Sequence, residues 1–466
     1  MRLTPEHSPP QEARRLFRIA GPLIAAYLAE YAMFVTTKLV VGSLGVEPLA
    51  AVGLAASLAH EGMVIMMGIL SVTGVLAAQA EGAGRKQEAG HAARQGLITA
   101  LILSVPLMAL IWNLGSIMRL AGQDEAVAAA AEPFLHALTP FVPAMLLFTA
   151  LRDFVAALSR TGPIMAITVA AVGFNWLLAE AMVHGRWGAP ELGVAGAGLA
   201  TSIVSWAMLA ALALYIWRKP ALRGYGLFRA RLRFDPKIIR VIFRLGLPIG
   251  AMVGLEAGLF TAVALLSGVI GAGMLAAHQV LMAWIGIPFV IALGIAEAGM
   301  VRVAHAVGRE DPAGARQAGF VALGIGAGAL TLLVAAPLLL AEEMTRLFLP
   351  ASAPGFDEVA ALVTQIMVVA AIFQVFDGAQ AIMARCLRGL RDAYVPLWIA
   401  GFCYWPLGVG GGALLAFPLG LGGAGLWIGL AAGLIVAACL LTFRFARLSG
   451  RRLAQAAERA PEAAAS

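Results

Sequence analysis

The chain has 466 residues, of which 61% are hydrophobic and only 13% are charged, and its formal net charge is +7. Soluble domains carry about 25% charged residues, so this composition excludes an ordinary soluble domain and indicates that lipid surrounds most of the surface. The basic residues lie in short clusters between apolar runs, as topology signals do, which argues against a nucleic-acid partner.

Long apolar segments follow one another along the chain. They are continuous rather than alternating, so they predict helices instead of strands, and a spanning helix needs about 20 apolar residues. We therefore predict an all-α membrane protein with twelve transmembrane helices. The first six cover about residues 17–42, 49–75, 92–114, 130–156, 163–184 and 193–217. The second six cover about residues 242–268, 273–304, 314–340, 358–385, 394–416 and 420–444.

These segments form two predicted six-helix lobes, residues 17–217 and 242–444, joined by a basic linker at residues 218–241. If the N-terminus is cytoplasmic, only four of the 33 lysines and arginines fall on the outer side, namely Lys38, Arg119, Arg186 and Arg346. The positive-inside rule then places residues 1–16, the linker and residues 445–466 in the cytoplasm. The last segment ends in a polar, alanine-rich tail that we expect to be disordered.

The two predicted lobes repeat each other in sequence. The stretch RLFRIAGPLIAAYLAEYAMF aligns with RVIFRLGLPIGAMVGLEAGLF. The matching positions are Pro22 with Pro248, Glu30 with Glu256, and Phe34 with Phe260. Because each lobe has an even number of helices, both lobes enter the membrane from the same side. The sequence therefore predicts two six-helix bundles related by a pseudo-two-fold axis along the membrane normal.

Several stretches match a known transporter family in order and spacing. They include QAEGAGRKQEAGHAARQG from residue 79, GRWGAPELGVAGAGLAT from residue 185 and FQVFDGAQAIMARCLRGLRDAYVP from residue 373. On these stretches the chain resembles the multidrug and toxic compound extrusion (MATE) family, in its NorM-like branch, over about residues 15–445. The resemblance implies a secondary exporter driven by an inward H⁺ or Na⁺ gradient and working by alternating access between two lobes.

Two carboxylates lie in the middle of predicted spans, where an acid costs about 2.5–3.5 kcal/mol on insertion scales. They are Glu256 in the seventh span and Asp377 in the tenth. Around Asp377, helical spacing places Phe373, Gln374 and Gln380 along one polar face. Two nearby carboxylates in a low dielectric must bind a cation or hold a proton. The resemblance implies that Glu256 and Asp377 form the cation-coupling site, with a hydrogen-bonded packing pair as the structural alternative.

The chain also departs from the family pattern. Phe373 replaces a tyrosine that relatives often carry, which removes an oxygen ligand for Na⁺ and inclines the prediction towards H⁺. Thr37 stands near the place of a common aspartate in the first span. Glu30 is a candidate for a second proton site or a cavity charge, or for a structural role with a neighbouring group. The candidates for an additional ion or substrate cavity are Glu30, Thr37, Asn175, Gln279, Phe373, Gln374 and Gln380.

No catalytic motif or phosphate-binding loop is present, so we expect neither an enzyme nor an ATP-driven pump. The three cysteines lack metal spacing, and we expect no metal centre, apart from Na⁺ at Glu256 and Asp377, and no cofactor other than the coupling ion. The expected partners are a small organic, cationic substrate and the lipid bilayer, with a monomer in the cell (inner) membrane. The alternative function is a flippase for a lipid-linked or polar metabolite in the same superfamily.

Overall fold

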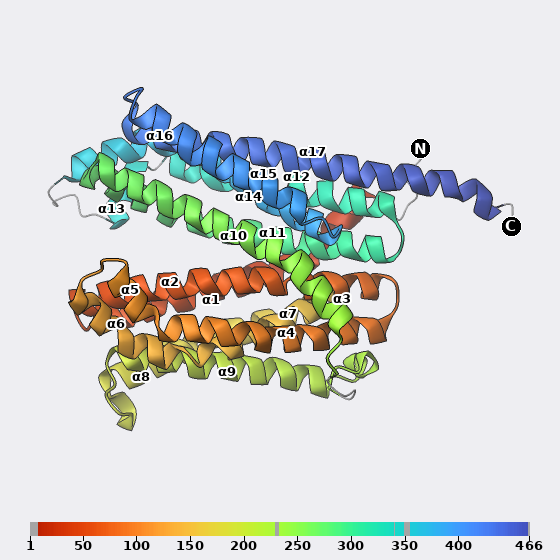
Figure 1. Cartoon of the computed structure of the whole chain (residues 1–466), viewed down its shortest axis with the longest axis horizontal. Helices are drawn as coiled ribbons and strands as arrows, with labels where there is room; N and C mark the ends of the chain where they lie inside the picture. Colours follow the sequence, from red (N-terminus) through yellow and green to blue (C-terminus); the bar gives the residue numbers. More distant parts are fainter. Residues whose placement is uncertain (1–7, 229–232, 340, 349–354, 465–466) are drawn as a thin grey trace. The chain divides into compact units, whose positions relative to one another are not determined.

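The computed structural model describes residues 8–228, 233–339, 341–348 and 355–464, and over these residues it is helical with connecting turns (Figure 1). Arg229 and Arg231 of the predicted linker lie outside the described residues, as do residues 1–7 and 465–466 of the two predicted termini. The helices up to residue 225 are α1 (Pro9–Gly42), α2 (Val46–Leu70), α3 (Val72–Gly82), α4 (Lys86–Trp112), α5 (Leu114–Leu120), α6 (Glu125–Leu138), α7 (Phe141–Ala157), α8 (Gly162–His184), η2 (Arg186–Gly188), α9 (Val194–Arg218) and η3 (Pro220–Tyr225). The later helices are α10 (Pro236–Ile270), α11 (Ala272–Gly308), α12 (Pro312–Leu339), α13 (Ala341–Phe348), α14 (Phe356–Gly389), α15 (Tyr394–Phe402), η4 (Cys403–Gly410), α16 (Gly411–Ala416) and α17 (Gly422–Ala464).

The number of spans agrees with the sequence. Among the described residues, eleven helices are long and apolar enough to cross a membrane, and the bent pair α6 and α7, which meet at 48°, would be a twelfth. The prediction of an all-helical, twelve-span membrane protein is therefore confirmed. Several helices begin before the predicted apolar segments, at Pro9, Pro236 and Pro312. Proline favours the first helical position because its missing N–H has no partner there in any case.

The last helix extends beyond the predicted span, since α17 continues through Ala464. Alanine has the highest intrinsic helix propensity, so an alanine-rich extension of an existing helix does not need a new nucleus. The disorder expected of the tail stays a prediction.

The chain divides into two compact units, residues 25–250 and residues 1–24 together with 251–466. Two helices change unit along their length. α1 does so two residues after Pro22, and α10 does so two residues after Pro248. A proline inside a helix removes one backbone hydrogen bond, so each changeover follows a locally weakened turn.

The backbone of the two units shows the same repeat as the sequence. Gly84, after α3, and Glu310, after α11, both have positive φ angles, of 73° and 57°. Ser159, after α7, and Arg391, after α14, have φ angles of 57° and 61°. A left-handed residue just beyond a helix ends the helix by letting the next N–H groups bond back to its last carbonyls. The matching helices of the two units therefore end with the same turn.

Each unit has its own apolar core. In residues 1–24 and 251–466, α14 packs against α11, α12 and α17, and Tyr404 and Trp427 are fully buried. In residues 25–250, α9 packs against α6, α7 and α8, and α7 packs against α3 and α4. Phe148 and Phe154 on α7 are fully buried there.

Candidate functional site

The first polar cluster, which we call the α14 cluster, consists of Glu256, Gln374, Asp377, Gln380 and Tyr404. A chain of hydrogen bonds runs through it. The Tyr404 hydroxyl donates to Gln380 Oε1 at 2.8 Å, and Gln380 Nε2 donates to Glu256 Oε1 at 3.1 Å. Because the Tyr404 hydroxyl is bonded to the amide oxygen, the amide N–H of Gln380 is the group that faces the Glu256 carboxylate.

Asp377 and Gln374 lie on the same helix but have a different environment. Both are buried, at 0% and 1% exposure. Among the described residues, neither carboxylate oxygen of Asp377 and neither amide atom of Gln374 has a hydrogen-bond partner. Glu256 is half-buried as a residue, whereas Asp377 is fully enclosed. A buried carboxylate without a partner is costly when ionised, so Asp377 needs a proton or a cation.

Phe373 precedes Gln374 on α14 and lies one turn before Asp377. It is fully buried and meets Phe260 and Trp427 edge-on, with ring centroids 6.2 and 5.6 Å apart. At this position of the helix the side chain is apolar and offers no oxygen. Gln279, which the sequence suggested as a further cavity residue, has an exposed side chain on α11 and makes no hydrogen bond to this cluster in the described part of the chain.

Sequence analysis missed Tyr404 as a member of this cluster. Tyr404 lies in η4, a π-helical segment that contains Pro406. Single π-helical turns within α-helices often occur at functional sites. Trp405 from the same segment packs closely on α10, since a Cβ added at Gly258 would lie 3.0 Å from its ring. Gly258 thus lets η4 approach α10 two residues from Glu256.

The second polar cluster, in residues 25–250, contains Glu30 of α1 and Arg152 and Asp153 of α7. Arg152 Nη1 lies 3.0 Å from Glu30 Oε1, and its Nε lies 3.6 Å from Asp153 Oδ1. The Arg152 guanidinium also lies 5.2 Å from the ring centroid of Tyr27. Arg152 and Asp153 were not among the sequence candidates, although a charged pair inside the apolar run LLFTALRDFVAAL was the available signal. Glu30 therefore has a buried cationic partner.

Thr37 and Asn175 were separate candidates that the structure brings together. Asn175 Nδ2 donates to Thr37 Oγ1 at 3.2 Å, and both residues are buried. Thr37 Oγ1 also donates to the Met33 carbonyl oxygen one turn earlier. The bond joins α1 to α8. Asn175 Oδ1 has no hydrogen-bond partner among the described residues, so it is a free acceptor inside this unit.

Both clusters contain carboxylate oxygens, and the α14 cluster also contains amide oxygens. Such oxygens suit a proton or a hard monovalent cation. Over the described residues, no group of three or more His, Cys, Asp or Glu side chains is placed to hold a metal ion. The α14 cluster has two acids and no direct ion pair with any described residue, whereas Glu30 and Asp153 are balanced in part by Arg152.

Comparison with known proteins identifies the family. The family model described as MatE matches residues 22–180 and 248–414. The protein named probable multidrug resistance protein NorM from Pseudomonas aeruginosa is 39% identical over 447 residues, which are 96% of this chain and 91% of the relative. The protein of the same name from Pseudomonas putida is 38% identical over 452 residues, 97% of this chain and 98% of the relative.

Solved structures give the same result. The eukaryotic MATE transporter AtDTX14 superposes with a TM-score of 0.84 at 25% identity, covering 95% of this chain and 99% of that one. An outward-facing multidrug resistance MATE transporter of the MOP superfamily has a TM-score of 0.85 at 21% identity, covering 95% of this chain and 96% of that one. From the family model, the sequence relatives and the fold, the chain belongs to the MATE family of membrane transporters.

Proposed function

We propose that this transporter is a secondary active antiporter that exports organic cations, drugs or other toxic compounds in exchange for inward H⁺ or Na⁺. The observation that carries the proposal is the pair of unpartnered buried side chains, Asp377 and Gln374, beside the hydrogen-bonded Glu256. An ionised Asp377 is too costly without a compensating ion. Ion binding therefore changes the relative stability of conformations, which is what coupled alternating access requires.

The coupling ion is H⁺ in this proposal. Na⁺ needs several oxygen ligands, and the residue one turn before Asp377 is Phe373, whose side chain has no oxygen. A proton needs only the carboxylate oxygens of Glu256 or Asp377. The α14 cluster already contains the carboxylate oxygens that a proton needs.

An organic cation fits the charges better than an anionic cargo. The α14 cluster has two acids, and the Glu30 cluster has two acids against the single base Arg152. A flippase for a lipid-linked pyrophosphate would be expected to have a cavity rich in arginine and lysine. The relatives named as multidrug resistance proteins support a drug as the substrate. We propose a monomer in the cell (inner) membrane with both termini in the cytoplasm.

The test uses purified protein in liposomes, with a fluorescent organic cation and separately imposed H⁺ and Na⁺ gradients. We expect the H⁺ gradient to drive transport and Asp377→Asn to abolish it, because an amide cannot exchange a proton. The matched control is Asp357→Asn, the same chemical change at an exposed position in the first turn of the same helix. Asp357→Asn should transport at the wild-type rate.

Three results would contradict all or part of the proposal. Full transport by Asp377→Asn would show that the α14 cluster is not the coupling site. Full transport with a Na⁺ gradient at equal pH on both sides would keep the antiport mechanism but replace H⁺ by Na⁺. If neither the H⁺ gradient nor the Na⁺ gradient drove transport, the antiport proposal itself would be wrong.

A further inference from the structure

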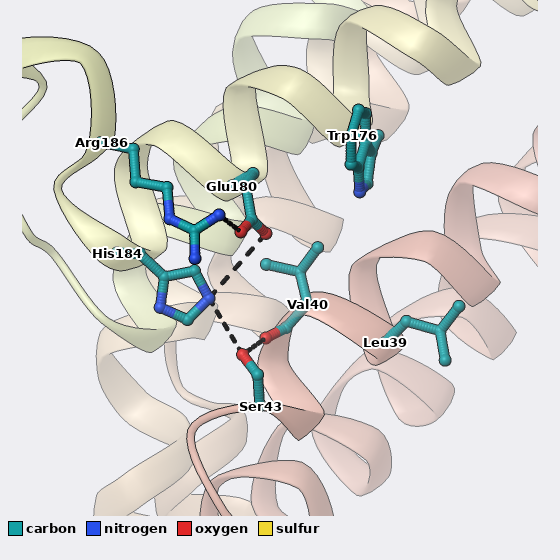
Figure 2. Close-up of a pocket in the computed structure, with 7 residues that line it drawn as sticks. All are labelled: Leu39, Val40, Ser43, Trp176, Glu180, His184 and Arg186. Atoms are coloured by element: carbon teal, nitrogen blue, oxygen red, sulfur yellow. Dashed lines mark hydrogen bonds and ion pairs between the residues drawn. The ribbon is translucent and has the colours of Figure 1, made fainter.

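A small cavity of about 230 Å³ lies where α1 and α8 end, within residues 25–250. Figure 2 shows Glu180, His184 and Arg186 gathered at one end of the cavity and the side chains of Leu39 and Trp176 at the other. None of these five residues belongs to the two clusters described above. The cavity therefore has a polar end and an apolar end and is separate from the proposed ion pathway.

The polar end is organised by fixed contacts. Arg186 Nη1 lies 2.6 Å from Glu180 Oε1. The Ser43 hydroxyl donates to the Val40 carbonyl oxygen at 2.6 Å, so His184 Nε2 is the donor in its 2.9 Å bond to Ser43 Oγ. Glu180 Oε2 lies 3.9 Å from the same nitrogen. The Arg186 side chain is 58% exposed, and its remaining N–H groups are available to an anion because the guanidinium has five donors.

The apolar end and its surroundings resemble a membrane interface. Leu39 is 70% exposed, Trp176 is 49% exposed, and Trp187 beside Arg186 is 70% exposed. Trp187 has a φ of 55°, a conformation that costs energy for a bulky side chain. Tryptophan is enriched where membrane spans meet the headgroup layer. Because α8 is a candidate span that ends at His184, the polar end of the cavity lies at headgroup depth.

We propose that this cavity binds the headgroup of a zwitterionic, amine-bearing phospholipid from the leaflet at this end of the span. The Arg186 guanidinium binds the phosphodiester, and Glu180 Oε2 accepts from the ammonium group. An acyl chain lies beside Trp176 and Leu39. The charges of Glu180 and Arg186 cancel, so this pair gives the site no net charge. It therefore favours a headgroup with both charges over an anionic headgroup.

The experiment counts lipids bound to the purified full-length chain by native mass spectrometry. Phosphatidylethanolamine and phosphatidylglycerol with identical acyl chains are titrated against the wild type, Arg186→Gln and Glu180→Gln. Arg186→Gln should weaken phosphatidylethanolamine binding about tenfold, the loss of one charge-assisted hydrogen bond. Glu180→Gln leaves Arg186 uncompensated and should reverse the preference towards phosphatidylglycerol.

The matched control is Arg346→Gln. Arg346 is also an exposed arginine paired with acidic side chains, at 2.7 Å from Glu342, but it lines no part of this cavity. Its substitution should leave lipid binding unchanged. Wild-type phosphatidylethanolamine binding by Arg186→Gln, an unchanged lipid preference in Glu180→Gln, or an equal loss in Arg346→Gln would each overturn the proposal. Binding is measured without transport, so the result does not depend on the proposed antiport function.

Discussion

Replacing Tyr404 with phenylalanine tests whether the α14 cluster depends on the orientation of one amide. The substitution removes a single oxygen and keeps the ring in the π-helical segment. In the wild type, that oxygen donates its hydrogen to Gln380 Oε1 and so directs Gln380 Nε2 towards Glu256. Without it, the Gln380 amide oxygen loses its donor, and the amide can turn over when Glu256 carries a proton that it can donate to that oxygen.

The size of the effect follows from burial. Tyr404 and Gln380 are both 0% exposed. A buried polar atom that loses its only partner costs about 1–3 kcal/mol. Since about 1.4 kcal/mol corresponds to a factor of ten in rate, we expect the maximal transport rate to fall about tenfold. The KM for the organic cation should stay within about twofold of wild type, because the lost interaction orients a residue rather than binding substrate.

The assay is the initial rate of cation transport in liposomes under a fixed pH gradient, measured over a range of substrate concentrations. Tyr215→Phe is the control. Tyr215 is a half-buried tyrosine on α9 that makes no side-chain hydrogen bond within the described residues, so its substitution should change neither Vmax nor KM. A third variant, Gln380→Leu, removes the amide itself.

The double variant decides the mechanism. If Tyr404 acts through Gln380, adding Tyr404→Phe to Gln380→Leu should cause no further loss, because the shared pathway is already broken. Independent, additive losses would refute the reasoning, as would a wild-type Vmax in Tyr404→Phe. A change confined to KM would instead place the hydroxyl in contact with the substrate.

Three further predictions concern other parts of the chain. Glu256→Gln should keep the hydrogen bond to Gln380 but lose the dependence of transport rate on the pH gradient, whereas a retained dependence would assign proton exchange to another group. Glu12 and Arg302 form a buried ion pair through two hydrogen bonds of 2.7 Å. Arg302→Met alone should therefore lower the free energy of unfolding by about 3–5 kcal/mol, and adding Glu12→Gln should restore part of this loss in thermal unfolding. Equal stability of all variants would contradict this prediction. The hydrogen bond from His91 and the backbone N–H groups at the start of α10 hold the pKa of Asp235 below its usual value of 3.8. The Asp235 carboxylate therefore stabilises the fold at pH above about 4 and loses this effect as the pH falls through the lowered pKa. The difference in Tm between wild type and Asp235→Asn should shrink below pH 4. A difference in Tm that grows on acidification would contradict this prediction.

Much of the α14 cluster could be predicted because its residues are unusual for their position. Glu256 and Asp377 are acids inside apolar segments, and helical spacing placed Gln374 and Gln380 on the face of Asp377. The hydrogen bond between Gln380 and Glu256 agrees with that expectation. Their role in coupling stays a prediction. Tyr404 was not predicted, because a tyrosine in an apolar span is ordinary, and only the fold brings it to Gln380.

Other candidates show where a sequence pattern gives too little information. Glu30 aligns with Glu256 in the repeat, yet Glu30 pairs with Arg152, whereas Glu256 bonds to a neutral amide. The two acids occupy matching positions along matching helices. What differs is the side chain supplied by another helix more than a hundred residues away, and a repeat alignment of one helix contains no information about it.

The sequence by itself determined the class of the molecule, the number of spans, the internal repeat and the family. These properties depend on local quantities, which are the length of an apolar run and the order of residues within it. The tertiary structure alone decided which buried polar groups find partners. Hydrogen bonds and ion pairs act over about 3–4 Å, and only the packing of α10, α14 and η4 brings groups from distant parts of the chain to that distance. That packing leaves Asp377 and Gln374 without partners among the described residues, and this is the property on which the proposed ion coupling depends.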